Sequence, residues 1–236
     1  MKSGISVSSV EKNKDVFTVV TDNNEKFKSK TILIAAGSHY RKLNIPGEKE
    51  FEGKGVSYCS ICDAPLFKNK AVAVIGGGNS ALGAVIDLFS YASKIYLIIR
   101  SDSFRGDIIL QEKIKSASWR TKVEIITMAV VQEIMGDNFV NGLKYLDRKT
   151  NKINEIKLGG VFVSIGYEPN SGLVKDLVEL NKYKQIIVDH KTQKTTQEGI
   201  WAAGDITDVL YKQNNIAIGD GIKAVLNIYD FITDLY

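Results

Sequence analysis

The stretch Ala71-Val-Ala-Val-Ile75, followed by Gly76-Gly-Gly-Asn-Ser-Ala81, decides the fold of this 236-residue chain. An unbroken apolar run predicts a buried strand of a parallel sheet, because such strands are covered on both faces. The glycines end this strand, and residues 79–92 fit a helix. A strand, a glycine-rich turn and a helix in this order are typical of a βαβ unit, so the sequence predicts an α/β protein.

The turn matches the G-x-G-x-x-A pattern of dinucleotide-binding folds. Gly76 allows the tight turn, Gly78 lets a pyrophosphate approach the backbone, and Ala81 permits close packing of the helix on the strand. Asn79 and Ser80 open the helix, whose positive end attracts the pyrophosphate. A strand–helix turn that binds no ligand is the alternative interpretation.

The next predicted strand, residues 94–100, ends at the position that selects the cofactor. An acid about 20 residues after the glycines binds the ribose of NAD, whereas an arginine there favours the 2′-phosphate of NADP. Arg100 stands at this position and Arg105 follows one turn later. A guanidinium has the charge and fork geometry for a phosphate, so we expect NADPH. NADH stays an alternative because Asp102 lies nearby, and both arginines also fit a solvated surface.

The only cysteines of the chain, Cys59 and Cys62, form a CxxC motif that is followed at once by Asp63. A CxxC beside a βαβ pattern predicts a redox dithiol. Zinc would need two more soft ligands, and His39 and His190 are far away in sequence, so no metal site is predicted. Two buried structural cysteines are the remaining alternative.

The rest of the chain alternates strands and helices. Residues 5–11, 15–21 and 25–35 predict a β meander, and residues 129–158 predict three antiparallel strands. Other strands are predicted at 123–127, 160–166, 185–188 and 199–205, helices at 107–117, 172–178 and 214–233, and a loop at 38–58. In the last helix the apolar positions, Ile218, Ile222, Val225, Ile228 and Phe231/Ile232, recur at helical spacing, which predicts one buried face.

The composition, 44% hydrophobic and 25% charged, is that of a soluble globular protein. The net charge is +4, but the lysines are scattered, so no nucleic-acid partner is expected. The N-terminus lacks the apolar core of a signal peptide, and no apolar run reaches the roughly 20 residues of a membrane helix. We therefore expect no membrane partner and a cytoplasmic location, where a CxxC stays reducible.

Several blocks of sequence occur together in a fixed order: 33–37, 45–48, 58–63, 74–81, 101–105, 165–170, 201–205 and 211–213. In these blocks, which cover almost the whole chain, the sequence resembles the low-molecular-weight thioredoxin reductases of bacteria and archaea. The resemblance implies two Rossmann-like, three-layer nucleotide-binding domains. An FAD-binding domain would be discontinuous (1–43 and 170–236), and an NAD(P)H-binding domain (44–169) would be inserted into it and carry the CxxC.

The resemblance also implies a chemistry. NADPH would reduce FAD, FAD would reduce the Cys59–Cys62 disulfide, and the dithiol would reduce thioredoxin or a similar small dithiol protein. Cys62 would face the flavin, Cys59 would attack the partner, and Asp63 would transfer protons. Physically, the attacking species is a thiolate, and a carboxylate can shuttle its proton. For Asp63 a helix-capping role is the alternative.

The flavin contacts also follow from the resemblance. Gly37 lies at the first crossover, Gly204 and Asp205 correspond to the motif that binds the ribityl and pyrophosphate region, and Gln213 corresponds to the position that meets the isoalloxazine edge. For Asp205 alone, an acid of a turn is the alternative. A homodimer is the expected assembly. The family usually has a second arginine beside Arg100, where this chain has Ser101, which weakens the preference for NADPH.

The family begins with a strand, a GxGxxG turn and a helix that hold the ADP half of FAD, and these 236 residues contain no such segment. The FAD-binding domain is therefore expected to be N-terminally truncated. A fragment of a longer enzyme, a truncated paralogue that oligomerises, and a nucleotide-binding remnant without flavin chemistry are the explanations left open. An NAD(P)H:flavin oxidase or diaphorase and the reductase of a peroxiredoxin system are alternative activities.

Overall fold

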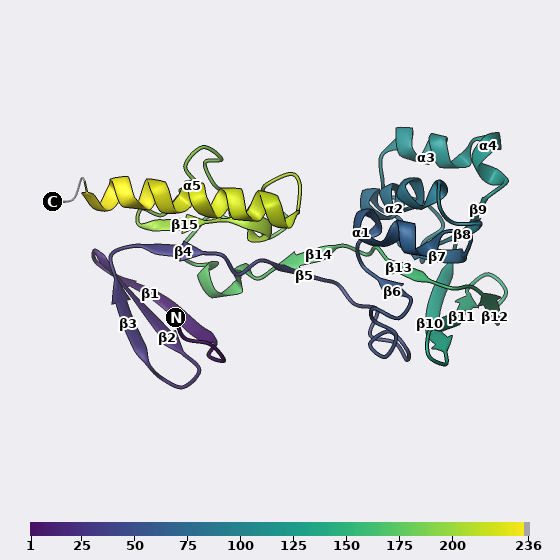
Figure 1. Cartoon of the computed structure of the whole chain (residues 1–236), viewed down its shortest axis with the longest axis horizontal. Helices are drawn as coiled ribbons and strands as arrows, with labels where there is room; N and C mark the ends of the chain where they lie inside the picture. The colour runs from purple at the N-terminus through teal and green to yellow at the C-terminus, as the bar shows by residue number, and fades with distance from the viewer. Residues whose placement is uncertain (234–236) are drawn as a thin grey trace. The chain divides into compact units, whose positions relative to one another are not determined.

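The computed structural model describes residues 1–233, and the chain folds as two compact units. The inserted unit comprises Tyr40–Gly166, and the discontinuous unit combines Met1–His39 with the residues from Tyr167 onward. An α/β protein in which one domain interrupts the other is thereby confirmed (Figure 1). The last three residues of the predicted segment 170–236 lie outside the described residues.

The inserted unit is built on a five-stranded parallel sheet with the order β6-β13-β7-β8-β9. Its strands are β6 (Val56–Ser57), β13 (Val161–Val163), β7 (Ala71–Ile75), β8 (Lys94–Ile98) and β9 (Val123–Ile126). The predicted strand 71–75 is confirmed and lies in the centre of the sheet. The predicted strand 160–166 is shorter, because β13 ends at Val163.

Both faces of this sheet are covered, as the apolar run predicted. Val72 and Val74 face the helices α2 (Asn79–Phe89) and α3 (Ile108–Lys115). Ala73 and Ile75 pack in a second cluster that includes residues of the antiparallel strands. The inserted unit therefore has three layers: helices, parallel sheet and antiparallel sheet (Figure 1).

The antiparallel layer is the predicted three-stranded segment. It consists of β10 (Ala129–Gly136), β11 (Val140–Asp147) and β12 (Lys152–Lys157). The predicted helix 107–117 is divided, because the backbone of Ser116 is extended between α3 and α4 (Ala117–Arg120). The Ser116 hydroxyl donates to the Lys113 carbonyl at 2.8 Å and so ends α3.

The discontinuous unit contains the antiparallel sheet β1 (Val7–Asn13), β2 (Val16–Thr21) and β3 (Lys26–Ser29). The predicted strand 25–35 is wrong as one element, because it divides between two sheets. Ser29 makes a local turn: its hydroxyl donates to the Thr31 carbonyl and accepts the Thr31 N–H. The chain then continues as β4 (Ile32–Ile34), which pairs in parallel with β15 (Ile200–Ala202).

Two more predicted elements of this unit differ. The predicted helix 172–178 is a short 3₁₀ helix, η2 (Ser171–Val174). The predicted strand 185–188 forms only isolated bridges, such as that between Ile186 and Thr207. Residues 38–58 are mainly turns, as expected, with a short strand β5 (Ser38–Tyr40) that pairs with β14 (Tyr167–Pro169).

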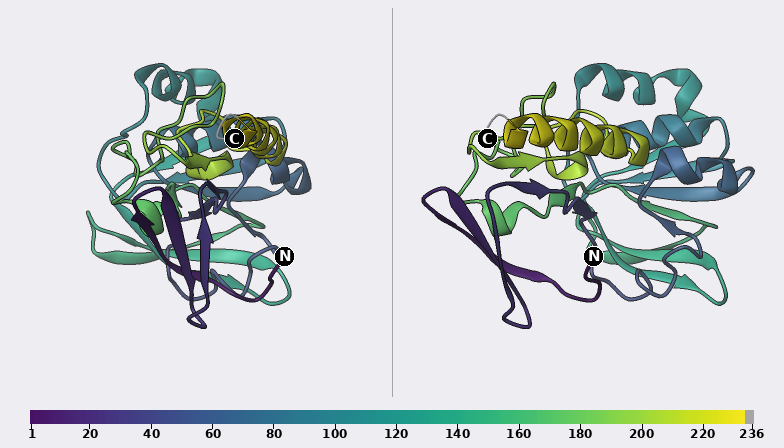
Figure 2. Two further views of the ribbon diagram at one scale, coloured as in Figure 1. Left: turned by 90° about the vertical axis from the view of Figure 1, so that its left-hand side faces the viewer. Right: turned by 60° about the vertical axis from the view of Figure 1, so that its left-hand side comes forward.

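The predicted final helix is confirmed as α5 (Asn214–Thr233), which runs along β15 (Figure 2). Its predicted buried face is wrong at Ile218, Ile222 and Val225, which are exposed, but Ile228 and Phe231 of that face are partly buried. Ala224 is buried, Phe231 packs edge-on against Trp201, and the Trp201 indole N–H donates to Asn227 Oδ1 at 3.1 Å. These contacts turn the side of α5 with Ala224, Asn227 and Phe231 toward the unit.

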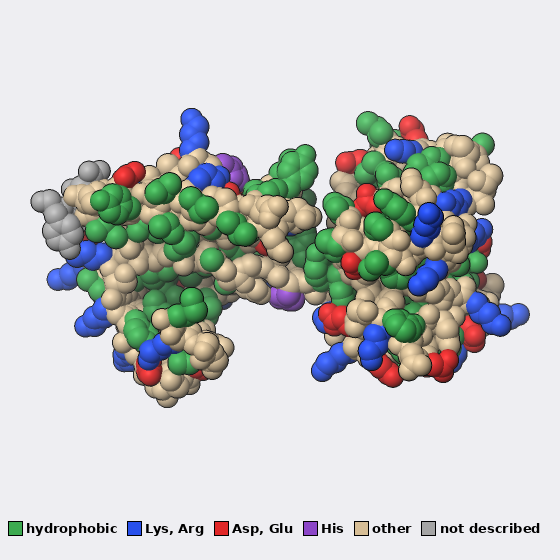
Figure 3. Space-filling view, in the orientation of Figure 1, with side chains coloured by type: hydrophobic (Ala, Val, Ile, Leu, Met, Phe, Trp, Pro, Cys, Tyr) green, Lys and Arg blue, Asp and Glu red, His purple; other side chains and the backbone are tan. Residues whose placement is uncertain are grey.

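The apolar side chains of the other face of α5 are exposed in the described structure: Ile218, Ile222, Val225, Leu226, Tyr229 and Ile232. Figure 3 shows hydrophobic side chains along this helix. We call these six exposed side chains the α5 stripe. Within residues 1–233 no helix has both the length and the apolar character needed to cross a membrane.

Candidate redox and nucleotide-binding sites

Cys59 and Cys62 form a disulfide at the one-turn helix α1 (Ser60–Asp63), with Cα atoms 5.4 Å apart. Cys59 is the N-cap of this turn, and its Sγ accepts the Cys62 N–H at 3.2 Å. Cys62 is exposed and Cys59 is partly buried. A backbone N–H aimed at Cys59 Sγ would stabilise negative charge on that sulfur if the disulfide were reduced.

Asp63 lies at the end of α1 and is held by a residue that the sequence interpretation missed. Ser57, which is 5% exposed, donates from Oγ to Asp63 Oδ2 at 2.7 Å. The same Oγ accepts the Cys59 N–H at 3.1 Å. Asp63 makes no side-chain capping bond to the following 3₁₀ helix η1 (Ala64–Phe67). Its carboxylate is therefore not used as a cap and is held by Ser57, which also binds the Cys59 backbone.

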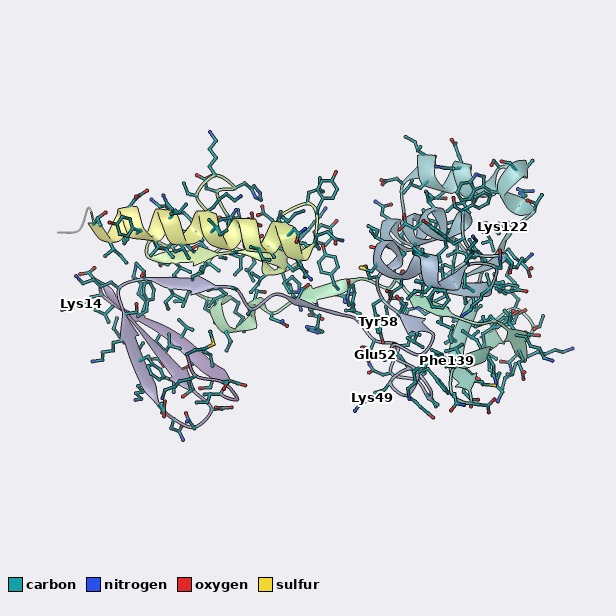
Figure 4. The ribbon with its side chains drawn as sticks, viewed as in Figure 1. Lys14, Lys49, Glu52, Tyr58, Lys122 and Phe139 are labelled. Carbon is teal, nitrogen blue, oxygen red and sulfur yellow. A yellow bond between two sulfur atoms is a disulfide. The ribbon has the colours of Figure 1, made fainter. Side chains whose placement is uncertain are left out.

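The residue before the first cysteine, Tyr58, is anchored by a buried acid (Tyr58 is labelled in Figure 4). Glu48, 2% exposed, accepts the backbone N–H groups of Leu43 and Asn44 at 2.8 and 2.6 Å and the Tyr58 hydroxyl at 3.1 Å. The Tyr58 ring also stacks on Tyr40, with ring centroids 5.5 Å apart. Burial, reinforced by Glu48, raises the pKa of Tyr58, so its hydroxyl stays protonated and donates.

The glycine turn has the geometry that its sequence predicts. Gly76 has φ +141°, and a Cβ atom there would lie 2.3 Å from the Ser164 carbonyl oxygen. Gly78 is the N-cap of α2, and a Cβ there would meet no atom within 4 Å. Ala81 is fully buried under the turn, whereas Asn79 and Ser80 are exposed at the start of α2. This backbone leaves open space at a helix N-terminus, which fits a pyrophosphate.

The loop after β8 folds back onto the glycine turn. The backbone N–H of Arg105 donates to the Gly77 carbonyl at 2.7 Å. The Asn79 amide donates to Asp107 Oδ2 at 3.1 Å and accepts the Asp107 N–H at 2.7 Å. Arg100, two residues beyond the end of β8, is exposed. The structure thus places the backbone of Arg105 at the glycine turn. The Asn79 side chain is hydrogen-bonded to Asp107 of the loop.

The predicted flavin residues lie in the discontinuous unit. Gly37 and Gly204 both have positive φ, +64° and +76°. A Cβ at Gly204 would lie 2.9 Å from Ala217 of α5, so a glycine is needed for this close approach. Asp205 is partly buried in the 3₁₀ helix η3 (Gly204–Ile206), and Gln213 is exposed where α5 begins. These residues fit the ribityl and isoalloxazine part of a flavin.

Lys212 is a charged group of this region that the sequence interpretation missed. Its Nζ donates to the Thr207 carbonyl at 2.6 Å. Burial lowers the pKa of Lys212, and the nearby carboxylates of Asp205, Asp208 and Asp220 oppose this change. Its position directly before Gln213 was the available signal. Within residues 1–233 no group of three or more His, Cys, Asp and Glu side chains could hold a metal ion.

A three-layer α/β unit with a glycine turn and a CxxC disulfide defines the class of nucleotide-dependent disulfide oxidoreductases. The family model "Pyridine nucleotide-disulphide oxidoreductase" matches residues 1–221, and the chain belongs to this family. The resemblance to low-molecular-weight thioredoxin reductases is also confirmed by solved structures. Thioredoxin reductase from Streptococcus pyogenes MGAS5005 is 34% identical with a TM-score of 0.86, and the match covers 97% of this chain and 73% of that chain.

Thioredoxin reductase from Giardia duodenalis is similar too, with 32% identity, a TM-score of 0.88 and coverage of 97% of this chain and 74% of that chain. Among curated proteins, an alkyl hydroperoxide reductase protein of Staphylococcus aureus (strain MRSA252) is 42% identical over 230 residues. That match covers 98% of this chain but 45% of the relative. The chain therefore spans less than half the length of this relative.

Proposed function

We propose that this chain carries the core of a flavoenzyme that passes electrons from NADPH, through FAD and the Cys59–Cys62 pair, to a protein disulfide. The observation that carries the proposal is the disulfide itself. It lies in the same unit as the glycine turn, and a backbone N–H is aimed at Cys59 Sγ. NADH is the alternative electron donor.

We assign residues 44–169 to NAD(P)H and residues 1–43 and 170–236 to FAD. Gly76, Gly78, Asn79, Ser80 and Ala81 would hold the pyrophosphate of NADPH, and the exposed Arg100 and Arg105 would hold its 2′-phosphate. Open space above Gly78 and the absence of room for a Cβ at Gly76 support this assignment. Gly37, Gly204, Asp205 and Gln213 would contact the flavin. When bound, these cofactors supply the two electrons that reduce the disulfide.

The protein residues then carry out thiol–disulfide exchange. The Cys59 thiolate attacks one sulfur of the partner disulfide, a mixed disulfide forms, and the other partner sulfur leaves with a proton. The Cys62 thiolate attacks Cys59 Sγ, which re-forms the internal disulfide and releases the partner as a dithiol. Asp63 holds and transfers the proton, and Ser57 keeps its carboxylate beside the cysteines.

For the acceptor we propose thioredoxin or a similar small dithiol protein. The relatives named as alkyl hydroperoxide reductases support a second candidate, a disulfide protein of a peroxide-reducing system. An oxidase or diaphorase would consume NADPH without the dithiol. The requirement for Cys59 and Cys62 therefore separates a disulfide reductase from an oxidase. We place the reaction in the cytoplasm, where a CxxC stays reducible.

The test measures NADPH oxidation by the purified protein, supplemented with FAD, with oxidised thioredoxin or with an oxidised peroxiredoxin-type partner. The expected result is turnover with one of these acceptors that is abolished in Cys59→Ser. Cys62→Ser is expected to trap the acceptor as a mixed disulfide through Cys59, seen by non-reducing electrophoresis. NADPH oxidation that is unchanged in both cysteine variants would show an oxidase and refute the proposal.

A further inference from the structure

A side-chain hydrogen bond joins the redox loop to the helix that follows the glycine turn. Ser60, between the two cysteines, donates from Oγ to Oδ2 of Asp87 at 2.7 Å. Both residues are partly buried, and α1 lies against α2. The bond therefore combines a charged acceptor with incomplete solvation, the conditions in which a hydrogen bond is strong.

The place of Asp87 in its own helix is unfavourable. It lies in the last turn of α2, where the carbonyl end of the helix repels negative charge. The last turn of α2 contains no basic residue to offset this repulsion. An acid at this unfavourable position is expected to be stabilised by another contact, and such exceptions often occur at functional sites. Here the compensating contact comes from Ser60 of the CxxC motif.

The hydrogen bond has two consequences for the cysteine pair. It is present while the disulfide is formed, so it stabilises the loop conformation of the oxidised state. It also holds a carboxylate beside the residue that adjoins Cys59, and a nearby negative charge disfavours ionisation of a thiol. The charge of the carboxylate favours the disulfide over the dithiol, and the hydrogen bond does so to the extent that it weakens when the loop is reduced.

We propose that Asp87 is a positioning residue that, through Ser60, shifts the thiol–disulfide equilibrium of Cys59 and Cys62 toward the disulfide. The dithiol is thereby a stronger reductant than it would be without Asp87. This inference rests on the proposed function, in which the pair donates electrons to a protein disulfide. Asp87 itself touches none of the reacting atoms.

The experiment uses the whole chain equilibrated with mixtures of reduced and oxidised glutathione at pH 7. Two glutathione thiols reduce the Cys59–Cys62 disulfide to two thiols and become one glutathione disulfide, so electrons and protons balance. The fraction of dithiol is then counted after alkylation. We expect Asp87→Ala and Ser60→Ala each to shift the equilibrium constant toward the dithiol about three- to tenfold. Tenfold corresponds to about 30 mV for this two-electron couple.

Three further variants make the test specific. The double variant Ser60→Ala/Asp87→Ala is expected to shift the equilibrium constant no more than the single variant with the larger shift. Both substitutions remove the same hydrogen bond, so their effects do not add. Ser60→Thr keeps the hydroxyl donor and is expected to stay near wild type. Glu112→Ala, which removes an exposed acid from α3, is the matched control and is expected to change nothing.

Equilibrium constants within twofold of wild type for both Asp87→Ala and Ser60→Ala would overturn the proposal. Shifts toward the disulfide, or shifts that add in the double variant, would overturn it as well. Because Ser60 lies outside α2, Ser60→Ala decides the outcome even if Asp87→Ala fails to fold. The measurement needs neither nucleotide nor flavin. If the variants show the expected shifts in the equilibrium constant but the enzyme has no reductase activity, the proposed function is refuted and the role of Asp87 is not.

Discussion

At the scale of single residues, the acid beside the disulfide depends on a hydroxyl outside the CxxC motif. Ser57 Oγ contacts both the Asp63 carboxylate and the Cys59 backbone. One buried side chain therefore fixes the acid relative to the first cysteine. The proton transfer assigned to Asp63 needs this geometry, because a general acid acts only within hydrogen-bond reach.

Ser57→Ala removes the donor to Asp63 and is expected to slow reduction of the partner disulfide by roughly tenfold or more, since a hydrogen bond to a charged group contributes about 1.5–3 kcal/mol. The effect is expected on kcat, with an unchanged KM for NADPH. Steady-state kinetics with a protein disulfide as acceptor test this. Ser118→Ala, at an exposed serine of α4, is the control. A changed KM for NADPH with normal kcat would contradict the role of Ser57.

Arg100→Ala is expected to weaken NADPH binding about ten- to a hundredfold and NADH binding much less, because only NADPH has a 2′-phosphate. Fluorescence titration with each nucleotide measures the two Kd values. Arg148→Ala, which removes an exposed arginine after β11, is the matched control. Equal losses for NADPH and NADH would contradict the assignment of Arg100 to the 2′-phosphate, and two unchanged Kd values would assign it to the solvated surface.

At the scale of elements, the turn between β7 and α2 is the most constrained backbone segment of the inserted unit's candidate nucleotide site. Gly76 has a positive φ and lies against the Ser164 carbonyl, which follows β13 in the same sheet. Gly83 lies one turn into α2, and a Cβ atom added there would have no neighbouring atom within 4 Å. Substitution by alanine should therefore lower the stability of the protein at Gly76 and raise it at Gly83.

Gly76→Ala is expected to destabilise the protein by at least about 1–3 kcal/mol, because a Cβ there meets a carbonyl oxygen in a strained conformation. NADPH affinity is expected to fall with it. Gly83→Ala is expected to stabilise α2 by about 1 kcal/mol, which raises Tm by about 2–4 °C. Thermal unfolding of both variants tests the pair. A Gly76→Ala protein with wild-type Tm and NADPH affinity would contradict the turn geometry.

At the scale of the whole molecule, the α5 stripe is the feature that the described structure leaves uncovered. Ile222 and Val225 are 57% and 56% exposed, and Ile218 and Tyr229 extend the same surface. A contiguous apolar surface of this kind marks an interaction site. We propose that a second copy of the chain covers it, in keeping with the expected homodimer.

A protein of these 236 residues is expected to show by light scattering a mass about twice 26.1 kDa. The double variant Ile222→Lys/Val225→Lys places two charges in the α5 stripe and is expected to be a monomer. Ile108→Lys/Ile109→Lys, on an exposed apolar pair at the start of α3, is the matched control and is expected to keep the wild-type mass. A monomeric wild type would contradict the homodimer.

The sequence by itself determined the features that depend on neighbouring residues. The apolar run 71–75 predicted a strand covered on both faces, the glycines predicted the strand–helix turn, and the spacing of Cys59 and Cys62 predicted their pairing. The helical spacing of residues 214–233 predicted α5. In each case the signal is local, since it comes from side-chain periodicity or backbone freedom within a few residues.

Only the tertiary structure decided which groups meet across the chain. Ser60 and Asp87 are joined although 27 positions separate them. The buried face of α5 was predicted from apolar spacing, but the contact of Phe231 with Trp201 and the burial of Ala224 leave Ile222 and Val225 exposed. These contacts depend on how elements pack, and periodicity contains no information about which neighbour a face will meet. The strand 71–75, the glycine turn and α5 were therefore determined locally, whereas the hydrogen bonds that position Asp63 and Asp87 were set by packing.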